Sequence, residues 1–227
     1  LIRQMADGLL RDPLTIDISP RNSAIDSVEQ WIIPVDKKRK TELFMQLLSE
    51  RQWPQTLVFV KTRKAVDQLL EALQTQGVQA DCIHGDRPQP ARLRALTRFK
   101  DNEVSMLIAT DVAARGLDIA QLPLVINFDL PINAEDYVHR IGRSGRAGAS
   151  GEAISLVSAD EIRQLAAIET LIQQLLQRRE HSDFKPEHRV PETRLGGQLV
   201  KKPKKPKKPK VPGGKNKVHL GNWFDES

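Results

Sequence analysis

The stretch SMLIATDVAARGLDIAQLPLVINF, residues 105–128, decides the fold of this chain. It contains two short runs, MLIA and LVINF, that are almost continuously apolar. Such runs are typical of strands buried on both faces of a parallel sheet, whereas a strand with one solvated face alternates apolar and polar residues. A third run of this kind, TLVFV, lies nearer the N-terminus. The sequence therefore predicts an α/β protein built on a buried parallel sheet.

Outward from this stretch, apolar β-rich runs alternate with helical patterns of roughly 8–15 residues, which indicates βαβ units and a sheet covered by helices on both faces. We expect strands at Val28–Val35, Thr56–Val60, Gln79–Ile83, Ser105–Ile108, Leu124–Phe128 and Ala153–Val157. We expect helices at Lys38–Glu50, Thr62–Gln76, Pro90–Lys100, Ala134–Ile141 and Ala159–Gln177.

Length and composition limit the class of protein. A chain of 227 residues suits one domain with appendages. No apolar run approaches the ~20 residues that a membrane-spanning helix needs, so we expect no membrane partner. Cys82 is the only cysteine, which excludes an internal disulfide and suits a reducing cytoplasm. The chain begins at Leu1 rather than at Met, and we expect it to be a piece of a longer protein.

The positive charge of the chain is concentrated at its C-terminal end. Residues 201–227 carry nine lysines against Asp225 and Glu226, a net charge of +7, so the other 200 residues account for −1 of the total of +6. Residues 181–200 are polar and aperiodic, and in KKPKKPKKPK, residues 201–210, proline at every third position favours an extended polyproline II segment. We therefore expect no packed structure after residue 180.

The decapeptide HRIGRSGRAG, residues 139–148, is the clearest functional motif. Arg140, Arg143 and Arg146 recur at every third position, with glycines between them. Guanidinium groups bind phosphate oxygens well, and glycine lets backbone and ligand approach closely. A solvated basic loop is the alternative. We consider a buried structural role for all three arginines unlikely, because each would need its own partner.

The residues that follow each expected strand are also rich in polar groups. Lys61-Thr62-Arg63 follows TLVFV, His84-Gly85-Asp86 follows DCI, Thr110-Asp111 follows MLIA, and Asp129 follows LVINF. The carboxyl ends of parallel strands lie at one edge of a sheet, where ligands bind in open α/β folds. We therefore expect these groups to lie close together.

Together these motifs carry a resemblance to a known family. VFVKT, HGD followed by QPAR, ATDVAARGLDI and HRIGRSGRAG resemble, in order and spacing, motifs IV, IVa, V and VI of the second RecA-like domain of a DEAD-box RNA helicase, closest to the bacterial RhlE-like group. The resemblance covers residues 1–178. The sequence departs from the family pattern at Ser144, where threonine is usual, and at Pro88 and Pro90, which a first helical turn tolerates.

The resemblance implies a domain organisation. Residues 1–27 resemble the end of the first RecA-like domain and the interdomain linker, residues 28–180 the C-terminal RecA-like domain, and residues 181–227 a disordered lysine- and proline-rich tail. The phosphate-cradling loop, the Asp-Glu-Ala-Asp box and the Ser-Ala-Thr motif of the first domain are missing, and Gly213-Gly214-Lys215-Asn216 lacks the Walker A spacing. We therefore expect this chain alone to hydrolyse no ATP.

The resemblance also implies roles in binding and hydrolysing ATP. Arg143 and Arg146 resemble the catalytic pair that reaches the γ-phosphate of ATP, with Arg146 as the arginine finger. Asp118 resembles the residue that accepts a hydrogen bond from the ribose, and Gly116 lets the backbone lie near the nucleotide. ATP is the implied cofactor, with Mg²⁺ held mainly by the missing domain. We expect no metal ligands in this chain.

On the RNA side, the resemblance implies contacts to the sugar-phosphate backbone, which position a strand without reading its sequence. The residues implied are Thr62, Gly85, Gln89, Arg92 and Thr110. His139 and Arg140 resemble contacts to the first domain, although His139 is alternatively a structural histidine, and Asp111 is alternatively a helix N-cap. For Arg63, we favour a solvated surface position.

The implied function is the C-terminal half of a cytoplasmic ATP-dependent RNA helicase that binds single-stranded or duplex RNA and the missing N-terminal RecA-like domain. The alternative is a non-catalytic RNA-binding or scaffold module with the same fold. For the lysine-rich tail, residues 201–217, we expect non-specific tethering to RNA or ribonucleoprotein, with a solubility tail as the alternative.

Overall fold

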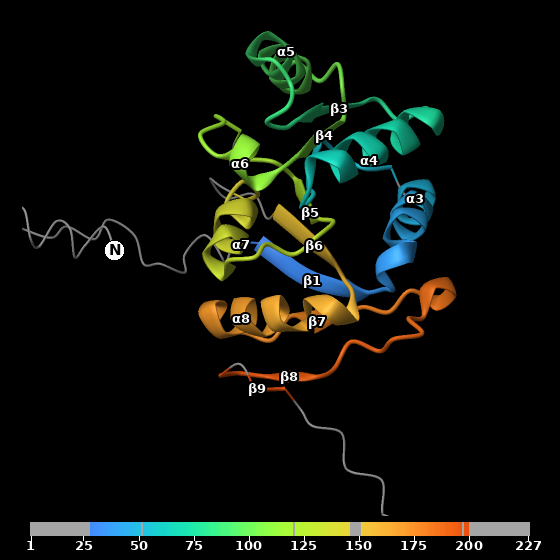
Figure 1. Ribbon diagram of the computed structural model, residues 1–227, viewed down its shortest axis with the longest axis vertical. Helices are drawn as coiled ribbons and strands as arrows, with labels where there is room; N and C mark the ends of the chain where they lie inside the picture. Colours follow the sequence, from blue (N-terminus) through green and yellow to red (C-terminus); the bar gives the residue numbers. More distant parts are fainter. Residues whose placement is uncertain (1–27, 51, 120, 146–150, 197, 200–227) are drawn as a thin grey trace, which may run out of the picture.

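The computed structural model describes residues 28–50, 52–119, 121–145, 151–196 and 198–199 (Figure 1). These residues form a seven-stranded parallel sheet in the order β3-β4-β2-β5-β6-β1-β7. Its strands are β1 (Val28–Pro34), β2 (Thr56–Phe59), β3 (Ala80–Ile83), β4 (Met106–Ala109), β5 (Leu124–Asn127), β6 (Gly151–Val157) and β7 (Gln177–Arg178). The predicted α/β fold with a parallel sheet between helices is confirmed.

Helices lie on both faces of the sheet. They are α3 (Lys40–Glu50), α4 (Arg63–Thr75), α5 (Gln89–Lys100), α6 (Asp111–Ala114), α7 (Ala134–Ile141) and α8 (Ile162–Ile172), with short 3-10 turns at Lys37–Arg39, Ala159–Glu161 and Ser182–Phe184. Within β2, Val58 packs with α3 and α4, while Leu57 and Phe59 pack with α5 and α6. Alternate residues of one strand thus fill two separate apolar layers, which is why the run is apolar throughout.

The six long strands and five long helices lie where the sequence predicts them, with shifts at their ends. The largest shift concerns the last helix, expected to reach Gln177. It ends at Ile172, because Gln173 takes a left-handed conformation (φ 54°) that stops the helix. Gln177 and Arg178 then pair with β1 as the edge strand β7. The short helix α6 was not predicted.

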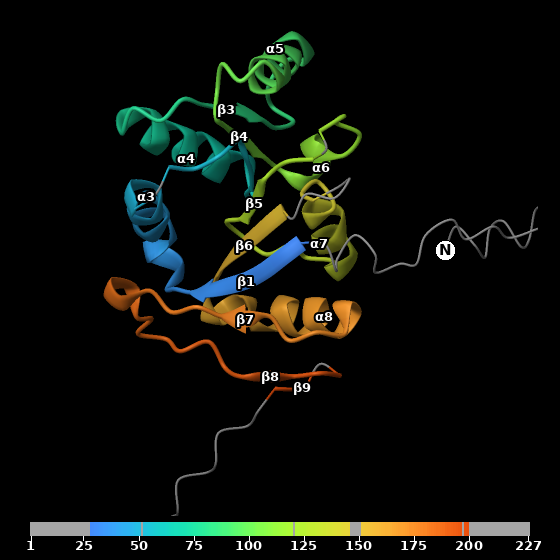
Figure 2. The same cartoon turned by 180° about the vertical axis from the view of Figure 1, so that it is seen from behind.

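The expectation of no packed structure after residue 180 is wrong for residues 181–196. These residues belong to a C-terminal strap, residues 177–196, which begins with β7 and runs along α8 (Figures 1 and 2). It ends beyond β8 (Thr193–Arg194), which pairs with β9 (Gln198–Leu199) in a two-stranded antiparallel sheet. Phe184 of the strap is buried in the apolar layer with α3 and α4, and Val190 is buried in a further apolar cluster with α7 and α8. Asp36 accepts hydrogen bonds from the backbone N–H groups of Glu187 and His188. Two isolated apolar residues and one carboxylate leave no periodic signal in the sequence.

No helix among the described residues is long and apolar enough to cross a membrane. The segments 1–27 and 200–227, for which the sequence predicted an interdomain linker and a lysine-rich tail, lie outside the described residues.

Candidate functional site

The carboxyl ends of the parallel strands meet at one edge of the sheet. β2 leads there into Lys61 and Thr62, β3 into His84 and Gly85, β4 into Thr110, and β5 into Asp129. Because β2 lies between β4 and β5, the groups that follow these strands are neighbours. The predicted convergence of polar groups at this edge therefore occurs, and the groups belong to two sets of loops that alternate along it: the loops after β3 and β2, and the loops after β4 and β5.

The predicted RNA contacts lie at starts of helices along this edge. Thr62 is the N-cap of α4, and its hydroxyl accepts a hydrogen bond from Ala65 N at 3.2 Å. Thr110 precedes α6 and is 8% exposed. Gln89, the first residue of α5, is exposed, and Arg92 in the same turn is partly buried, with no protein partner for its Nε atom among the described residues. Helix N-termini and hydroxyl groups of this kind suit binding to phosphate.

Arg63 joins two of these positions. It pairs with Asp86, and its guanidinium lies 3.4 Å from where a Cβ atom on Gly85 would be. The loops after β2 and β3, which carry Thr62 and Gly85, are therefore in contact through this side chain. Arg63 is exposed, as expected, but no sequence pattern indicated its pairing across the two loops.

Arg140 of the arginine motif is deeply buried, with 2% of its surface exposed. Its Nε and Nη2 atoms donate to the two carboxylate oxygens of Asp111 at 2.6 and 2.7 Å. Its Nη1 atom donates to Asn127 Oδ1 at 2.9 Å and to the carbonyl oxygen of Asp129 at 2.7 Å. The guanidinium also lies 4.8 Å from the centre of the Phe59 ring. Arg140 thus has the buried structural role that we did not expect for all three arginines together, and it joins β5 and α6 to α7.

This pairing settles the position of Asp111. It is the first residue of α6, and Thr110 occupies the N-cap position. The Asp111 carboxylate instead accepts two hydrogen bonds from Arg140. This bidentate geometry is the strong form of an arginine–carboxylate pair.

Arg143 holds the loop that follows α6. Its Nη1 atom donates to the carbonyl oxygens of Leu117 at 3.0 Å and Ile119 at 3.3 Å. Next to it, Ser144 Oγ donates to the carbonyl oxygen of Leu122 at 2.9 Å. The hydroxyl that replaces the usual threonine hydroxyl therefore has a structural partner. Arg146, the predicted arginine finger, lies outside the described residues.

The loop held by Arg143 carries the two predicted nucleotide contacts. Gly116 has φ +74°, a left-handed conformation that disfavours residues with a Cβ atom. The Asp118 side chain is 95% exposed and pairs with Lys100 at 3.1 Å. Gly116, Asp118 and Arg143 are therefore brought together.

A shallow hollow lies beside this loop, between α6 and α7. Phe59, Asp111, Ala114, Arg115, Asp136, His139, Arg140 and Arg143 line it. His139 is exposed, so the structural alternative for this histidine does not hold. Arg115 pairs with Asp136, whose carboxylate raises the pKa of Arg115 above its ordinary value by a hydrogen bond and by its charge. Arginine and aspartate side chains thus both line the hollow.

Three further residues of this edge, Lys40, Asp129 and Glu161, had no predicted role in binding or catalysis. Lys40 is 2% exposed, and its ammonium donates to Glu161 at 2.7 Å, to Asp129 Oδ1 at 3.1 Å and to the carbonyl oxygen of Phe128 at 2.8 Å. Asp129 Oδ2 accepts a hydrogen bond from Lys61 N at 3.0 Å. Asp129 therefore contacts the loop that carries Thr62 through its carboxylate and Arg140 through its own carbonyl oxygen. Its position directly after a buried strand was the only sequence signal.

Comparison with known proteins gives a consistent set of relatives. A model of the helicase conserved C-terminal domain matches residues 39–148. The DEAD-box ATP-dependent RNA helicase CshA of Geobacillus kaustophilus (strain HTA426) is 40% identical over 177 residues, which cover 78% of this chain and 38% of the relative. CshA of Bacillus subtilis (strain 168) is 39% identical over 168 residues, which cover 74% and 34%. The chain spans less than two fifths of the length of these curated relatives.

Experimental structures of similar fold give the same picture. The E. coli DEAD-box protein SrmB, bound to regulator of ribonuclease activity A, is 36% identical with a TM-score of 0.67, over 73% of this chain and 98% of that chain. Dbp5 of S. cerevisiae, bound to RNA and ADP BeF3, is 28% identical with a TM-score of 0.72, over 80% of this chain and 49% of that chain. The likeness to SrmB thus extends over nearly the whole of the SrmB chain.

Proposed function

This chain belongs to the DEAD-box RNA helicase family as a C-terminal helicase domain, and from that premise we propose that it is the second half of an ATP-dependent RNA helicase. The other half is a first RecA-like domain in the same protein, which holds ATP and most of the Mg²⁺ coordination. The observation that carries the proposal is the loop that follows Thr110 and α6. Arg143 donates to its carbonyl oxygens at Leu117 and Ile119, which brings Gly116 and Asp118 near this arginine. Thr62, Gly85 and Thr110 lie at the carboxyl edge of the same sheet.

On the nucleotide side, this chain supplies arginines and one carboxylate. Arg143 and Arg146 reach the phosphates from across the interdomain cleft, where phosphoryl transfer spreads negative charge over the equatorial oxygens. The exposed carboxylate of Asp118 accepts a hydrogen bond from the ribose, and the backbone at Gly116 lies close to the nucleotide. In the present structure Arg143 donates to carbonyl oxygens, so it exchanges one of these bonds for phosphate when the cleft closes.

Contact with the first domain falls to His139, which is exposed on α7. Arg140 is buried, so we propose that it acts through Asp111 as a positioning residue, setting the place of α6 and of the loop after it. Closure of the two domains on ATP completes the arrangement of arginines around the transferred phosphate.

On the RNA side, Thr62, Gly85, Gln89, Arg92 and Thr110 contact the sugar-phosphate backbone. Hydroxyl groups, a glycine backbone and one arginine bind phosphate without reading bases, so the core binds single-stranded or duplex RNA independently of sequence. Cleft closure bends the bound strand and separates it locally from its partner. The lysine-rich tail, residues 201–217, adds salt-dependent tethering to RNA. We place the protein in the cytoplasm, which its single cysteine supports.

The test is the RNA-stimulated ATPase activity of the protein with its first domain restored. Replacing Arg146→Ala should lower this activity by about 10³-fold or more, because an arginine finger contributes on that scale. Arg163→Ala, at an exposed position on α8, is the matched control and should leave the rate unchanged. Near-normal turnover of Arg146→Ala would reject the catalytic role and favour a non-catalytic RNA-binding module.

A further inference from the structure

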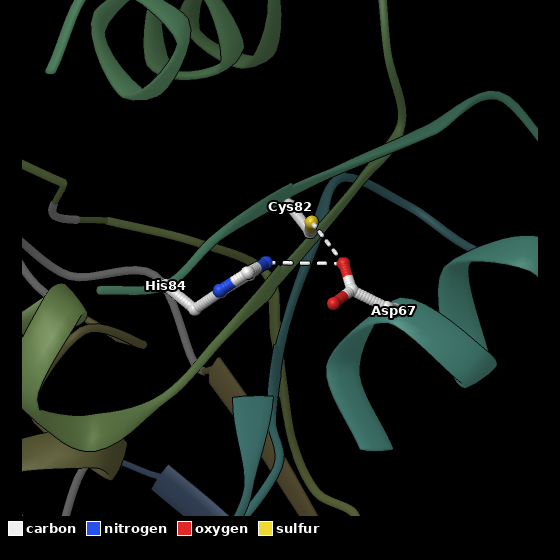
Figure 3. Close-up of side chains that lie close together, drawn as sticks. All are labelled: Asp67, Cys82 and His84. Atoms are coloured by element: carbon white, nitrogen blue, oxygen red, sulfur yellow. Dashed lines mark hydrogen bonds and ion pairs between the residues drawn. The ribbon is translucent and has the colours of Figure 1, made fainter. Parts of the chain in front are cut away.

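Three side chains with metal-ligating atoms converge between α4 and β3, away from the arginine motif (Figure 3). His84 Nε2 lies 3.0 Å from Asp67 Oδ1, and Cys82 Sγ lies 4.0 Å from the same oxygen. All three ligand atoms lie within 4.8 Å of one another. Among the described residues, this is the one place where three such groups come so close.

The fold explains why these residues meet. Cys82 and His84 are two positions apart in and just after β3, so both side chains point to the face that α4 covers. Asp67, on α4, presents its carboxylate to both (Figure 3). Cys82 is fully buried and His84 is 2% exposed, whereas the Asp67 side chain is 53% exposed. The cluster therefore has an apolar floor and one side open to solvent, which is a path for an ion.

Hydrogen bonding among the three groups does not account for the arrangement. The thiol-to-carboxylate distance of 4.0 Å is too long for a strong hydrogen bond, so His84 and Asp67 make the one good contact. His84 Nδ1 has no protein partner among the described residues. That atom stays unpaired whether Nε2 donates to Asp67 or binds an ion, so it does not distinguish the two states.

We propose that Asp67, Cys82 and His84 form a three-ligand site for Zn²⁺ or a similar borderline-soft divalent ion. A sulfur, an imidazole nitrogen and a carboxylate oxygen are the donors that Zn²⁺ prefers, and water completes a tetrahedral site with three protein ligands. Binding displaces one proton from the Cys82 thiol and forms a thiolate–zinc bond, with the ion balancing the charges of thiolate and carboxylate.

The distances require only small movements. With Zn–S near 2.3 Å and Zn–N or Zn–O near 2.0–2.1 Å, tetrahedral ligands lie roughly 3.3–3.6 Å apart. The His84–Asp67 pair at 3.0 Å opens slightly, and the Cys82–Asp67 pair at 4.0 Å closes slightly. Rotation of the exposed Asp67 side chain provides both changes, and the Cys82–His84 pair, which lies within 4.8 Å, closes by at most about 1.3 Å.

An ion at this position would join α4 to β3. Thr62 lies at the start of α4, and Gly85 directly follows His84. The ion would therefore hold together two loops that we assign to RNA binding. This consequence rests on the proposed function, but the site itself does not.

Titration of the chain with Co²⁺ alone tests the site. Cys82 is the only cysteine, so a thiolate-to-cobalt absorption band in the near ultraviolet can arise from no other residue. We expect this band at a stoichiometry of one ion per chain, its loss on addition of Zn²⁺, and a higher thermal unfolding midpoint with Zn²⁺. Absence of the band at saturating Co²⁺ would overturn the proposal.

Two variants locate the ion. Asp67→Asn, at an exposed helix position, should keep the fold and weaken Co²⁺ binding at least tenfold, in line with the loss of one ligand. Glu71→Gln, one turn further along α4 and also exposed, is the matched control and should bind like the parent chain. Cys82→Ala should remove the band. Undiminished Zn²⁺ binding by Asp67→Asn or Cys82→Ala would place the ion elsewhere, and neither RNA nor ATP enters these measurements.

Discussion

The two sets of loops at the sheet edge differ in how their side chains are held. In the loops after β4 and β5, the contacts of Arg140 are buried and each nitrogen of its guanidinium donates to an acceptor, while Arg143 holds the loop after α6. In the loops after β3 and β2, Thr62, Gly85 and Gln89 are exposed, and among the described residues the Thr62 hydroxyl bonds within its own helix turn. The first set is thus held rigidly by buried partners, whereas the second is exposed; under the proposed function these are a preassembled frame for charge stabilisation and an open surface for a flexible strand.

This difference has a consequence for mutations. Substitutions in the β4 and β5 set should reduce folding stability together with activity, because they leave buried partners unpaired. Substitutions in the β3 and β2 set should reduce RNA binding with little loss of stability. Each prediction below tests one side of this contrast.

The largest effect is expected for Arg140→Met. The change removes the charge but keeps most of the volume, and it leaves the Asp111 carboxylate and the Asn127 amide without their partner. Breaking a buried ion pair in this way costs about 3 kcal/mol or more of unfolding free energy. Urea unfolding of the chain measures the loss, with the exposed Arg163→Met as control. A loss below about 1 kcal/mol would show that the buried contacts of Arg140 do not stabilise the packing of α6 and α7 on β5.

A somewhat smaller loss is expected for Lys40→Met, and this variant tests whether the two sets of loops are independent. Glu161 keeps its hydrogen bonds from Leu130 N and Ser158 N, but Asp129 loses its cation. We expect a loss of about 2 kcal/mol in urea unfolding, the cost of leaving buried acceptors unpaired.

Because Asp129 also holds Lys61 N, RNA affinity should fall in the same variant, measured with the first domain restored. Lys38→Met, at an exposed position just before α3, is the control for both measurements. Lost stability with unchanged RNA affinity would mean that the β5 end does not position the Thr62 loop.

Much of the fold could be predicted because its signals are local. The runs TLVFV, MLIA and LVINF are apolar for a reason that acts on each strand separately, namely burial on both faces. By contrast, β7 and the C-terminal strap depend on tertiary contacts, such as Arg179 lying 3.9 Å from the Trp31 ring and Asp36 binding the Glu187 backbone. No periodic pattern records such contacts.

The candidate site was predictable by location but not by the state of each side chain. The position of Thr62, Gly85 and Thr110 after buried strands was enough to place them at one edge. The three arginines of HRIGRSGRAG look alike in sequence, yet Arg140 is buried because Asp111 and Asn127 approach it from other elements. Residue spacing carries no information about partners that lie 13 and 29 positions away.

In the loops after β3 and β2, Thr62→Ala distinguishes an effect on RNA binding from an effect on folding stability. Loss of the N-cap hydrogen bond to Ala65 N should cost about 1 kcal/mol of unfolding free energy. Loss of one hydrogen bond to phosphate should weaken RNA binding by up to about tenfold, equivalent to the net value of a single neutral hydrogen bond. Thr62→Ser keeps the hydroxyl and should restore both values. RNA affinity that stays at the parental value in Thr62→Ala would remove this residue from the RNA surface.

The smallest effect is expected at the β1 and β6 end of the edge, where an exposed ion pair replaces the buried ones. The ammonium of Lys37 lies 2.8 Å from Asp160, and this hydrogen bond, with a second from Ser158, lowers the pKa of Asp160 from 3.8 to about 2. A carboxylate with a lowered folded-state pKa stabilises the protein above its unfolded pKa, and this contribution disappears as the pH falls through about 2.

With the two side chains 72% and 53% exposed, solvent screening should keep the contribution of this pair below about 1 kcal/mol. Asp160→Asn should therefore lower the unfolding free energy slightly near neutral pH, and the parent and variant should converge as the pH approaches about 2. Urea unfolding at several pH values measures this, with Asp101→Asn at an exposed position as control. A deficit that stays constant with pH would mean that Asp160 acts through the neutral hydrogen bond from Ser158, because only a charge-dependent contribution titrates.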